Sequence, residues 1–275
     1  SSANLEGRTL AQVLAGAQKS YPGVLGTGVV KLPGLNAGRT GLTEAQAKEA
    51  GYDVVTALVP TDDKAHYYPD ASFFITKLIA DRSTRKLLGV QVFGPGSVDK
   101  MVDMGAVLDD FENADFAYAP PFSTAIHPFV QAVYVLMNKL DGTIVSMTPA
   151  EYAAGKAEGY TVVDVAPEPS IRGAVYVNLG AVNGEIKEEK LLLVCAKGKR
   201  GYFLQNRLRH YGYTNTVVLE GATFFNDVKV KNNIEEAVSK EDETRVKALG
   251  FLKDKRTPDK FNGRVITRNG KITAM

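Results

Sequence analysis

The chain has 275 residues, of which 44% are hydrophobic and 23% are charged, and these values are ordinary for a globular protein. This length allows two domains of about 100–200 residues each. The formal net charge of +2, with no basic run interleaved with aromatic residues, argues against nucleic-acid binding. No run of about 18 uninterrupted apolar residues occurs, so we expect no membrane span.

Cys195 is the only cysteine in the sequence. One cysteine cannot form an intramolecular disulfide, and a single thiol is typical of a reducing cytoplasm, which is the location we expect. Without its context, a lone cysteine is more often a small buried hydrophobe than a reactive group, because free cysteine is among the most buried residue types. The residues around it therefore decide how it is interpreted.

The first segment, residues 1–142, contains three strand-like stretches that are rich in β-branched and aromatic residues. The polar link at residues 81–85 predicts a hairpin turn between the last two of them. Apolar residues then recur at helical spacing in residues 99–111 and again from Pro128 to Gly142. This pattern predicts an α+β domain, an antiparallel sheet with helices packed on it. The strand-like stretches are residues 53–59, 72–80 and 86–93.

The second segment, residues 146–228, alternates strand-like stretches with helices. Thr148 and Glu151 form a capping box with Pro149 at the first helical position, so a helix should begin there. Residues 200–211 predict a further helix. Near-continuous apolar strands between helices indicate an α/β domain with a parallel sheet. The expected strands are residues 160–165, 174–179, 191–195 and 216–219.

The third segment, residues 229–275, is charged and too short to bury a core of its own. It includes a strand-like stretch at residues 264–268, followed by a turn at Asn269 and Gly270. We interpret this segment as a linker and the start of a further domain.

Cys195 directly follows an apolar strand and precedes a helix, so its loop can point backbone N–H groups and the positive end of the helix dipole at the sulfur. Lys197, Lys199 and Arg200 add cationic side chains. These groups favour the thiolate, which is the nucleophilic form, and would also stabilise a persulfide anion. Glycines allow the loop to curl tightly. The persulfide-binding loop consists of Ala196, Lys197, Gly198, Lys199, Arg200 and Gly201.

A phosphatase uses a similar loop between a cysteine and an arginine and is the competing interpretation. Those loops hold one more residue than the four that separate Cys195 from Arg200. The tighter ring suits a single sulfur atom better than a phosphate, so we favour sulfur transfer. An inert cysteine on the same fold is the other alternative.

Residues 146–226 resemble a rhodanese domain. The resemblance rests on Val163-Asp164-Val165, on the Cys-x-x-Gly-x-Arg loop, and on residues 210–213 and 217–221. Ala166 stands where the family usually has arginine, and residues 170–174 depart from the usual motif, which leaves the substrate open. The resemblance implies a sulfurtransferase in which Cys195 carries a persulfide.

Residues 1–142 resemble the dimerisation domain of flavin-dependent pyridine nucleotide–disulfide oxidoreductases, closest to coenzyme A disulfide and persulfide reductases. The resemblance implies a homodimer in which Tyr67 and Tyr118 reach the partner's active site, where a phenol can hydrogen-bond a thiolate or persulfide. The alternative is that they are interface or core aromatics. The matching motifs are Ala3-Asn4-x-x-Gly7-Arg8, Leu25-Gly26-Thr27, Thr40-Gly41-Leu42-Thr43-Glu44-x-x-Ala47, His66-Tyr67-Tyr68-Pro69 and residues 117–123.

His127 and Pro128 superficially match the His-Pro base of two-cysteine disulfide reductases. Ala132 stands where those enzymes place the orienting glutamate, so we expect His127 to be a helix-start residue. The resemblance also implies that residues 1–20 are a remnant of a flavin-domain helix. FAD, NAD(P)H and coenzyme A are implied for the intact protein. No Gly-x-Gly-x-x-Gly motif follows a strand, so we expect no bound cofactor, and no metal, in this chain.

The resulting hypothesis is a persulfide-carrying sulfurtransferase within a coenzyme A disulfide/persulfide or polysulfide reductase. Its expected partners are a second copy and small sulfur donors such as thiosulfate, polysulfide or coenzyme A persulfide. The alternative is a catalytically silent fragment that dimerises and docks a partner through a rhodanese-like domain.

Overall fold

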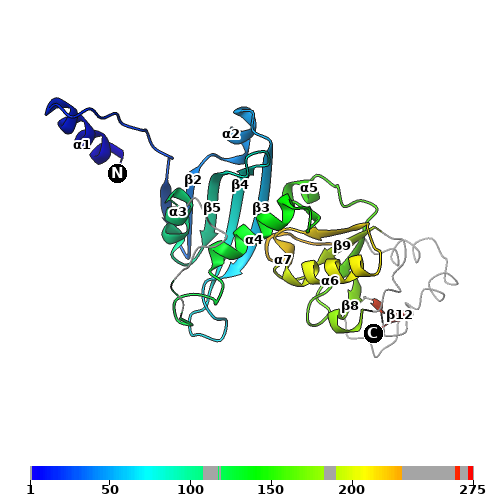
Figure 1. Cartoon of the computed structure of the whole chain (residues 1–275). Coiled ribbons are helices and arrows are strands. Elements are labelled where there is room, and N and C mark those ends of the chain that lie inside the picture. Colours follow the sequence, from blue (N-terminus) through cyan, green and yellow to red (C-terminus); the bar gives the residue numbers. More distant parts are fainter. Residues whose placement is uncertain are drawn as a thin grey trace.

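The computed structural model describes residues 2–107, 117, 119–182, 190–230, 264–266 and 272–274. Helix α1 (Ser2–Leu14) stands apart from the remaining elements at the end of an extended segment (Figure 1). The other described elements form two sheets with their own helices. None of the helices in these ranges has both the length and the apolar character needed to cross a bilayer.

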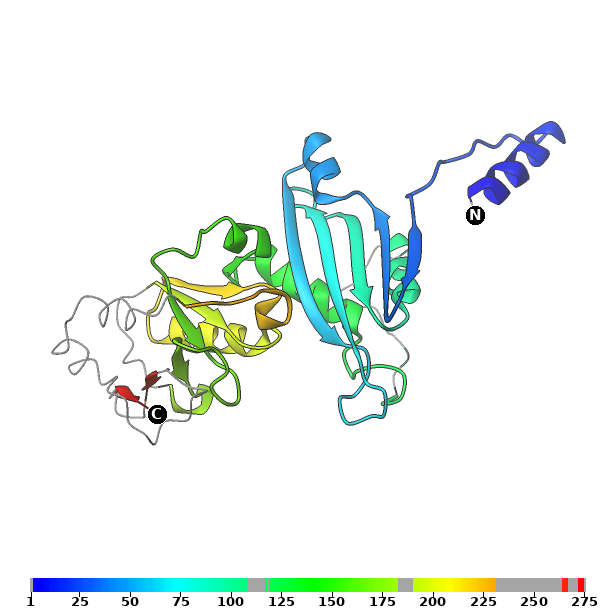
Figure 2. The same cartoon turned by 180° about the vertical axis from the view of Figure 1, so that it is seen from behind.

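The first domain is a five-stranded antiparallel sheet in the order β1-β2-β5-β4-β3. Helices α3 and α4 cover one face (Figure 2). In the described part of the chain, the opposite face has no covering helix from this domain, and the second domain contacts it at β3 and β4. The core between sheet and helices contains the fully buried Leu78, Val90, Met101 and Phe129. The elements are β1 (Gly28–Leu32), β2 (Leu35–Gly41), α2 (Glu44–Glu49), β3 (Val54–Asp62), β4 (Phe73–Asp81), β5 (Leu87–Gly94), α3 (Val98–Val107) and α4 (Pro128–Leu140).

The predicted antiparallel sheet and its hairpin are confirmed. β4 pairs antiparallel with both β3 and β5, and the Arg85 N–H donates to the Asp81 carbonyl oxygen at 2.8 Å to close the turn. The helix predicted at residues 99–111 is seen as α3 up to Val107, and residues 108–111 lie outside the described residues. β1, β2 and α2 were not predicted.

Asp81 gives the hairpin a pH-dependent contribution to stability. Its carboxylate accepts hydrogen bonds from Ser83 Oγ and Thr84 Oγ1, both at 2.6 Å, and from the Thr84 N–H at 3.0 Å. These hydrogen bonds lower the pKa of Asp81 from 3.8 to about 2, and the bond from the Ser83 side chain has the largest effect. Because the pKa is lower in the folded state, the contribution is present above the unfolded value and is lost as pH falls from 3.8 towards 2.

Asp81→Asn is therefore expected to lower the free energy of unfolding at pH 7, and its difference from the unchanged protein should shrink as pH falls through this window. Urea unfolding at a series of pH values measures this. Asp53→Asn is the matched control, because Asp53 is an exposed carboxylate paired with Arg82 at 3.6 Å. A difference that does not depend on pH between neutral and strongly acid conditions would contradict the assignment.

The second domain has a parallel sheet in which β9 lies between β7 and β10, with β8 and β6 outside them. β11 adds a parallel strand beside β8, and β12 pairs antiparallel with β11. The capping box at Thr148 and Glu151 is confirmed. The elements are β6 (Ser146–Met147), α5 (Pro149–Ala153), β7 (Thr161–Asp164), β8 (Val175–Val177), η1 (Leu179–Ala181), β9 (Leu191–Val194), α6 (Lys199–His210), β10 (Thr216–Leu219), α7 (Ala222–Phe225), β11 (Arg264–Ile266) and β12 (Ile272–Ala274).

Candidate functional site

Cys195 follows directly on β9, an interior strand of the parallel sheet, and α6 begins four residues later. The chain reverses at Gly198, whose φ of 91° is a left-handed conformation that glycine adopts without strain. This conformation points the Gly198 N–H at Cys195, and it donates to the Sγ atom at 3.1 Å. The sequence prediction that a loop amide is directed at the sulfur is thus seen in the structure.

The thiol is covered in this arrangement. Cys195 is 3% exposed and packs in the core cluster with Val165, Leu193 and Leu204. Cys195 is therefore a largely buried thiol at the start of its loop.

Arg200 and Gly201 fix the start of α6 against the sheet. Arg200 Nε donates to the carbonyl oxygen of Val165, after the end of β7, at 2.6 Å. A Cβ atom at Gly201 would lie 3.2 Å from the carbonyl oxygen of Leu193, so the first turn of α6 packs directly on β9. Arg200 keeps further guanidinium N–H groups besides Nε with which to hold an anion.

The two lysines of the loop have partners other than the sulfur. Lys197 Nζ forms an ion pair with Asp62 at the end of β3, in the first domain. Lys199 Nζ lies 5.8 Å from the centre of the Phe203 ring, at a distance typical of a cation–π contact. Both predicted cations thus belong to the loop, but the Lys197 side chain is directed to the first domain.

Helix α7 backs the loop through two main-chain hydrogen bonds. The Thr223 N–H donates to the Cys195 carbonyl oxygen at 3.1 Å, and the Phe224 N–H donates to that of Ala196 at 3.0 Å. These bonds join the end of β9 to the segment that follows β10. The loop is therefore held from the side of α7 as well as by α6.

Asp164, part of the Val163-Asp164-Val165 motif, orders the neighbouring loop. Its carboxylate is 1% exposed and accepts from the backbone N–H groups of Ala166 at 3.0 Å, Ser170 at 2.5 Å and Ile171 at 2.9 Å. Charge-assisted hydrogen bonds of this kind stabilise a buried carboxylate. Asp164 thus shapes the edge of the sheet next to Cys195 without touching the sulfur.

The tyrosines proposed for the first domain are only partly described. Tyr67 lies in the loop between β3 and β4 and is 69% exposed, with its ring 5.5 Å from that of His66. Tyr118 lies outside the described residues. His127 is the N-cap of α4, where its Nδ1 accepts from the Phe129 N–H at 3.2 Å, and burial lowers its pKa. The prediction that His127 starts a helix is confirmed.

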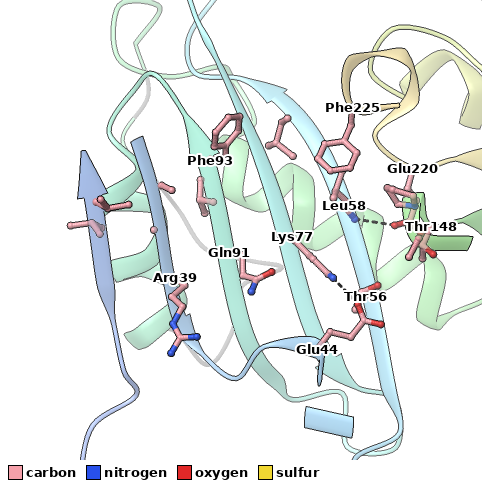
Figure 3. A pocket seen from close by; sticks show the side chains of 18 of the residues that line it. Arg39, Glu44, Thr56, Leu58, Lys77, Gln91, Phe93, Thr148, Glu220 and Phe225 are labelled. Atoms are coloured by element: carbon pink, nitrogen blue, oxygen red, sulfur yellow. Dashed lines mark hydrogen bonds and ion pairs between the residues drawn. The ribbon is translucent and has the colours of Figure 1, made fainter. Parts of the chain in front are cut away.

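Sequence reasoning missed a buried carboxylate at the junction of the two domains. Glu220, after β10, accepts from the Leu58 N–H at 3.0 Å (Figure 3). It also accepts from Lys139 Nζ at 2.5 Å and from Ser146 Oγ at 2.7 Å. Lys139 Nζ also donates to the Thr56 carbonyl oxygen at 2.8 Å. Glu220 therefore joins β3 and α4 of the first domain to β6 of the second.

The uncovered face of the first sheet forms a cleft of about 810 Å³ that continues onto the second domain. Figure 3 shows Phe93 and Phe225 at one end of this cleft and the Glu44–Lys77 ion pair, at 2.6 Å, at the other. Within the described residues no group of three or more His, Cys, Asp or Glu side chains could hold a metal ion.

The first domain matches a known family. Residues 29–129 match the model of the pyridine nucleotide-disulphide oxidoreductase dimerisation domain. This match describes the first domain and not the whole chain.

The chain is 40% identical over 129 residues to the NAD(P)H sulfur oxidoreductase (CoA-dependent) of Pyrococcus furiosus. It is 39% identical over 129 residues to the NAD(P)H coenzyme A polysulfide/persulfide reductase of Pyrococcus horikoshii. Each alignment covers 45% of this chain, and the chain spans 29% of the length of each relative. The activities in these names are those of the relatives.

Two solved structures resemble a larger part of the chain. The NAD-dependent persulfide reductase from A. fulgidus is 30% identical with a TM-score of 0.73, over 81% of this chain and 43% of that one. Reduced Bacillus anthracis CoADR-RHD is 28% identical with a TM-score of 0.71, over 80% of this chain and 42% of that one. Residues 29–129 are little more than a third of the chain, so both likenesses extend well into the parallel-sheet domain.

Proposed function

We propose that the second domain is a rhodanese-type sulfurtransferase in which Cys195 carries a persulfide, and that it serves a coenzyme A-dependent persulfide or polysulfide reductase. The observation that carries this proposal is the N–H of Gly198 donating to Cys195 Sγ at the end of an interior parallel strand, β9. An N–H directed at the sulfur stabilises a thiolate and, after sulfur uptake, a persulfide anion.

The reaction needs two displacements. The Cys195 thiolate attacks the outer sulfur of a persulfide, polysulfide or thiosulfate. The new bond to Sγ forms as the donor's S–S bond breaks, and the leaving group departs with the electron pair as a thiolate, a shorter polysulfide or sulfite. An acceptor thiolate then attacks the outer sulfur, and the Cys195 thiolate is released. Arg200 and the loop amides are the groups that stabilise the anionic persulfide.

Reduction of the transferred sulfur belongs to parts of the intact protein that use FAD, NAD(P)H and coenzyme A. The chain has no Gly-x-Gly-x-x-Gly loop after a strand that would cradle a dinucleotide phosphate. We therefore assign no cofactor site to this chain, and no step of the proposed transfer involves these cofactors.

The match to a dimerisation domain suggests a homodimer. The high exposure of Tyr67 supports its proposed place against a partner subunit, since a large aromatic side chain at an exposed loop tip is well suited to an interface. There its phenol would hydrogen-bond a thiolate or persulfide, and the same role is proposed for Tyr118.

A second candidate is a silent module that dimerises and docks a partner without sulfur transfer. It is favoured by the coverage of the thiol, since Cys195 is 3% exposed, and by the ion pair that occupies Lys197. The two candidates differ in whether Cys195 reacts.

Cys195→Ser is expected to abolish sulfur transfer from thiosulfate or polysulfide to a thiol acceptor, because a hydroxyl cannot carry a sulfane sulfur. Cys195 is the only cysteine, so no other thiol can substitute for it. The measurement is the initial rate of transfer, with thermal unfolding of both proteins as the control for folding. An unchanged rate in the serine variant would support the silent module.

A further inference from the structure

The loop around Cys195 is attached to the first domain at one cross-strand pair. Asp62 is the last residue of β3 and Phe73 is the first residue of β4, and the two are register partners. Asp62 holds Lys197 by an ion pair, and the Phe73 ring meets the Phe224 ring edge-on with centroids 4.4 Å apart. The loop thus contacts β3 and β4 at the end where the connecting segment leaves them, and that segment carries Tyr67.

The contact between the Phe73 and Phe224 rings is linked to Cys195 through α7. The N–H groups of Thr223 and Phe224 donate to the carbonyl oxygens of Cys195 and Ala196. Gly221, just before α7, lies so close to the first domain that a Cβ atom there would be 2.9 Å from Leu58 Cδ2. α7 is therefore seated on β3 and β4, and it forms a fixed support on one side of the loop.

The ion pair between Lys197 and Asp62 is a weaker kind of support. The side chains of Lys197 and Asp62 are 35% and 36% exposed, so water screens their attraction and the pair adds little to overall stability. Among the described residues, it is, however, the one side-chain ion pair between the loop and the first domain. An anion that approaches from solvent can compete with Asp62 for Lys197.

We propose that Asp62 is a positioning residue that holds Lys197, and with it the loop around Cys195, against the first domain, so that an anionic sulfur donor gains access to the thiol by displacing Asp62 from Lys197. This inference rests on the proposed sulfur transfer for the identity of the donor. It also links the reactivity of a thiol that is 3% exposed to a contact of its loop that the substrate's own charge weakens.

The test is the rate of alkylation of Cys195 by iodoacetamide, a neutral reagent, measured as a function of pH up to the plateau at which the thiol is fully ionised. The plateau rate reports access to the sulfur and not its ionisation. Asp62→Asn is expected to raise the plateau rate about two- to fivefold, the factor that a screened ion pair can impose on an opening equilibrium.

Salt provides a readout that a merely structural role would not affect. In the unchanged protein, alkylation should become faster as ionic strength rises, because salt screens the Lys197–Asp62 pair. Asp62→Asn and Lys197→Met should both lose this dependence, and combining them should have no larger effect than either alone. Asp53→Asn removes an exposed carboxylate paired with Arg82 in the same domain and should behave as the unchanged protein does.

The proposal would be overturned if the plateau rate of Asp62→Asn were equal to or below that of the protein without substitutions. It would also be overturned if alkylation of the protein without substitutions did not respond to salt. The second measurement needs no variant, so it decides the matter even if Asp62→Asn folds poorly. Alkylation requires no sulfur transfer. A protein that shows the expected alkylation but never forms a persulfide would therefore sink the proposed function and leave the control of access by Asp62 in place.

Discussion

Glu220→Ala is expected to lower the free energy of unfolding by about 3–5 kcal/mol, the cost of removing one partner from a buried ion pair. The carboxylate is 5% exposed and accepts hydrogen bonds from the Leu58 N–H, Lys139 Nζ and Ser146 Oγ. Its removal leaves the ammonium group of Lys139, whose side chain is 17% exposed, without its carboxylate. The loss should affect both domains, since these donors come from both.

Urea unfolding measures this effect, and two further variants define its origin. Lys139→Met in the Glu220→Ala background should recover part of the loss, because the uncompensated charge is gone. Asp141→Asn is the matched control, since it breaks the exposed Arg85–Asp141 pair at 2.8 Å and should cost less than about 1 kcal/mol. A Glu220→Ala protein as stable as this control would show that the junction is not held by the buried carboxylate.

Gly89→Ala is expected to prevent the first domain from folding stably. A Cβ atom at Gly89 would lie 2.0 Å from the Leu42 carbonyl oxygen and 3.0 Å from the Leu42 nitrogen, both of them backbone atoms. The Leu42 segment cannot retreat easily, because its N–H donates to the Leu88 carbonyl oxygen at 2.8 Å. Overpacking a side chain costs about 1–3 kcal/mol, and a clash with fixed backbone should exceed that range.

The yield of folded protein and its urea unfolding curve measure the effect of Gly89→Ala. Gly28→Ala is the control, because a Cβ atom there would have nothing within 4 Å and Gly28 does not have a positive φ. It should fold normally. A Gly89→Ala protein with an unchanged unfolding midpoint would contradict the close approach of β5 to Leu42.

The sequence predicted those parts of the fold whose pattern is local. The strands β3, β4 and β5 were found because they are rich in β-branched, aromatic and other large apolar residues, and α4 was found from its apolar spacing and Pro128. β1 and β2 were missed because Gly34, Gly38 and Gly41 interrupt the pattern that identifies a strand. Gly34 lies between β1 and β2 with a positive φ, whereas Gly38 and Gly41 allow close packing, and these roles appear only in three dimensions.

The candidate site was predictable to the same extent. The loop at Cys195 and the N–H of Gly198 directed at the sulfur follow from a short motif between a strand and a helix. Asp62 and Glu220 could not be identified, because their partners are 135 and 81 residues away along the chain. Nothing local in the sequence indicates how two domains dock, and it is this docking that places Asp62 beside Lys197.

The intact mass of the unmodified chain after treatment with polysulfide tests the role of Cys195 most directly. Our account predicts an adduct of one sulfur atom that maps to Cys195 and is removed by a thiol reductant. A folded protein that gains no such adduct, or an adduct that persists in Cys195→Ala, would contradict it.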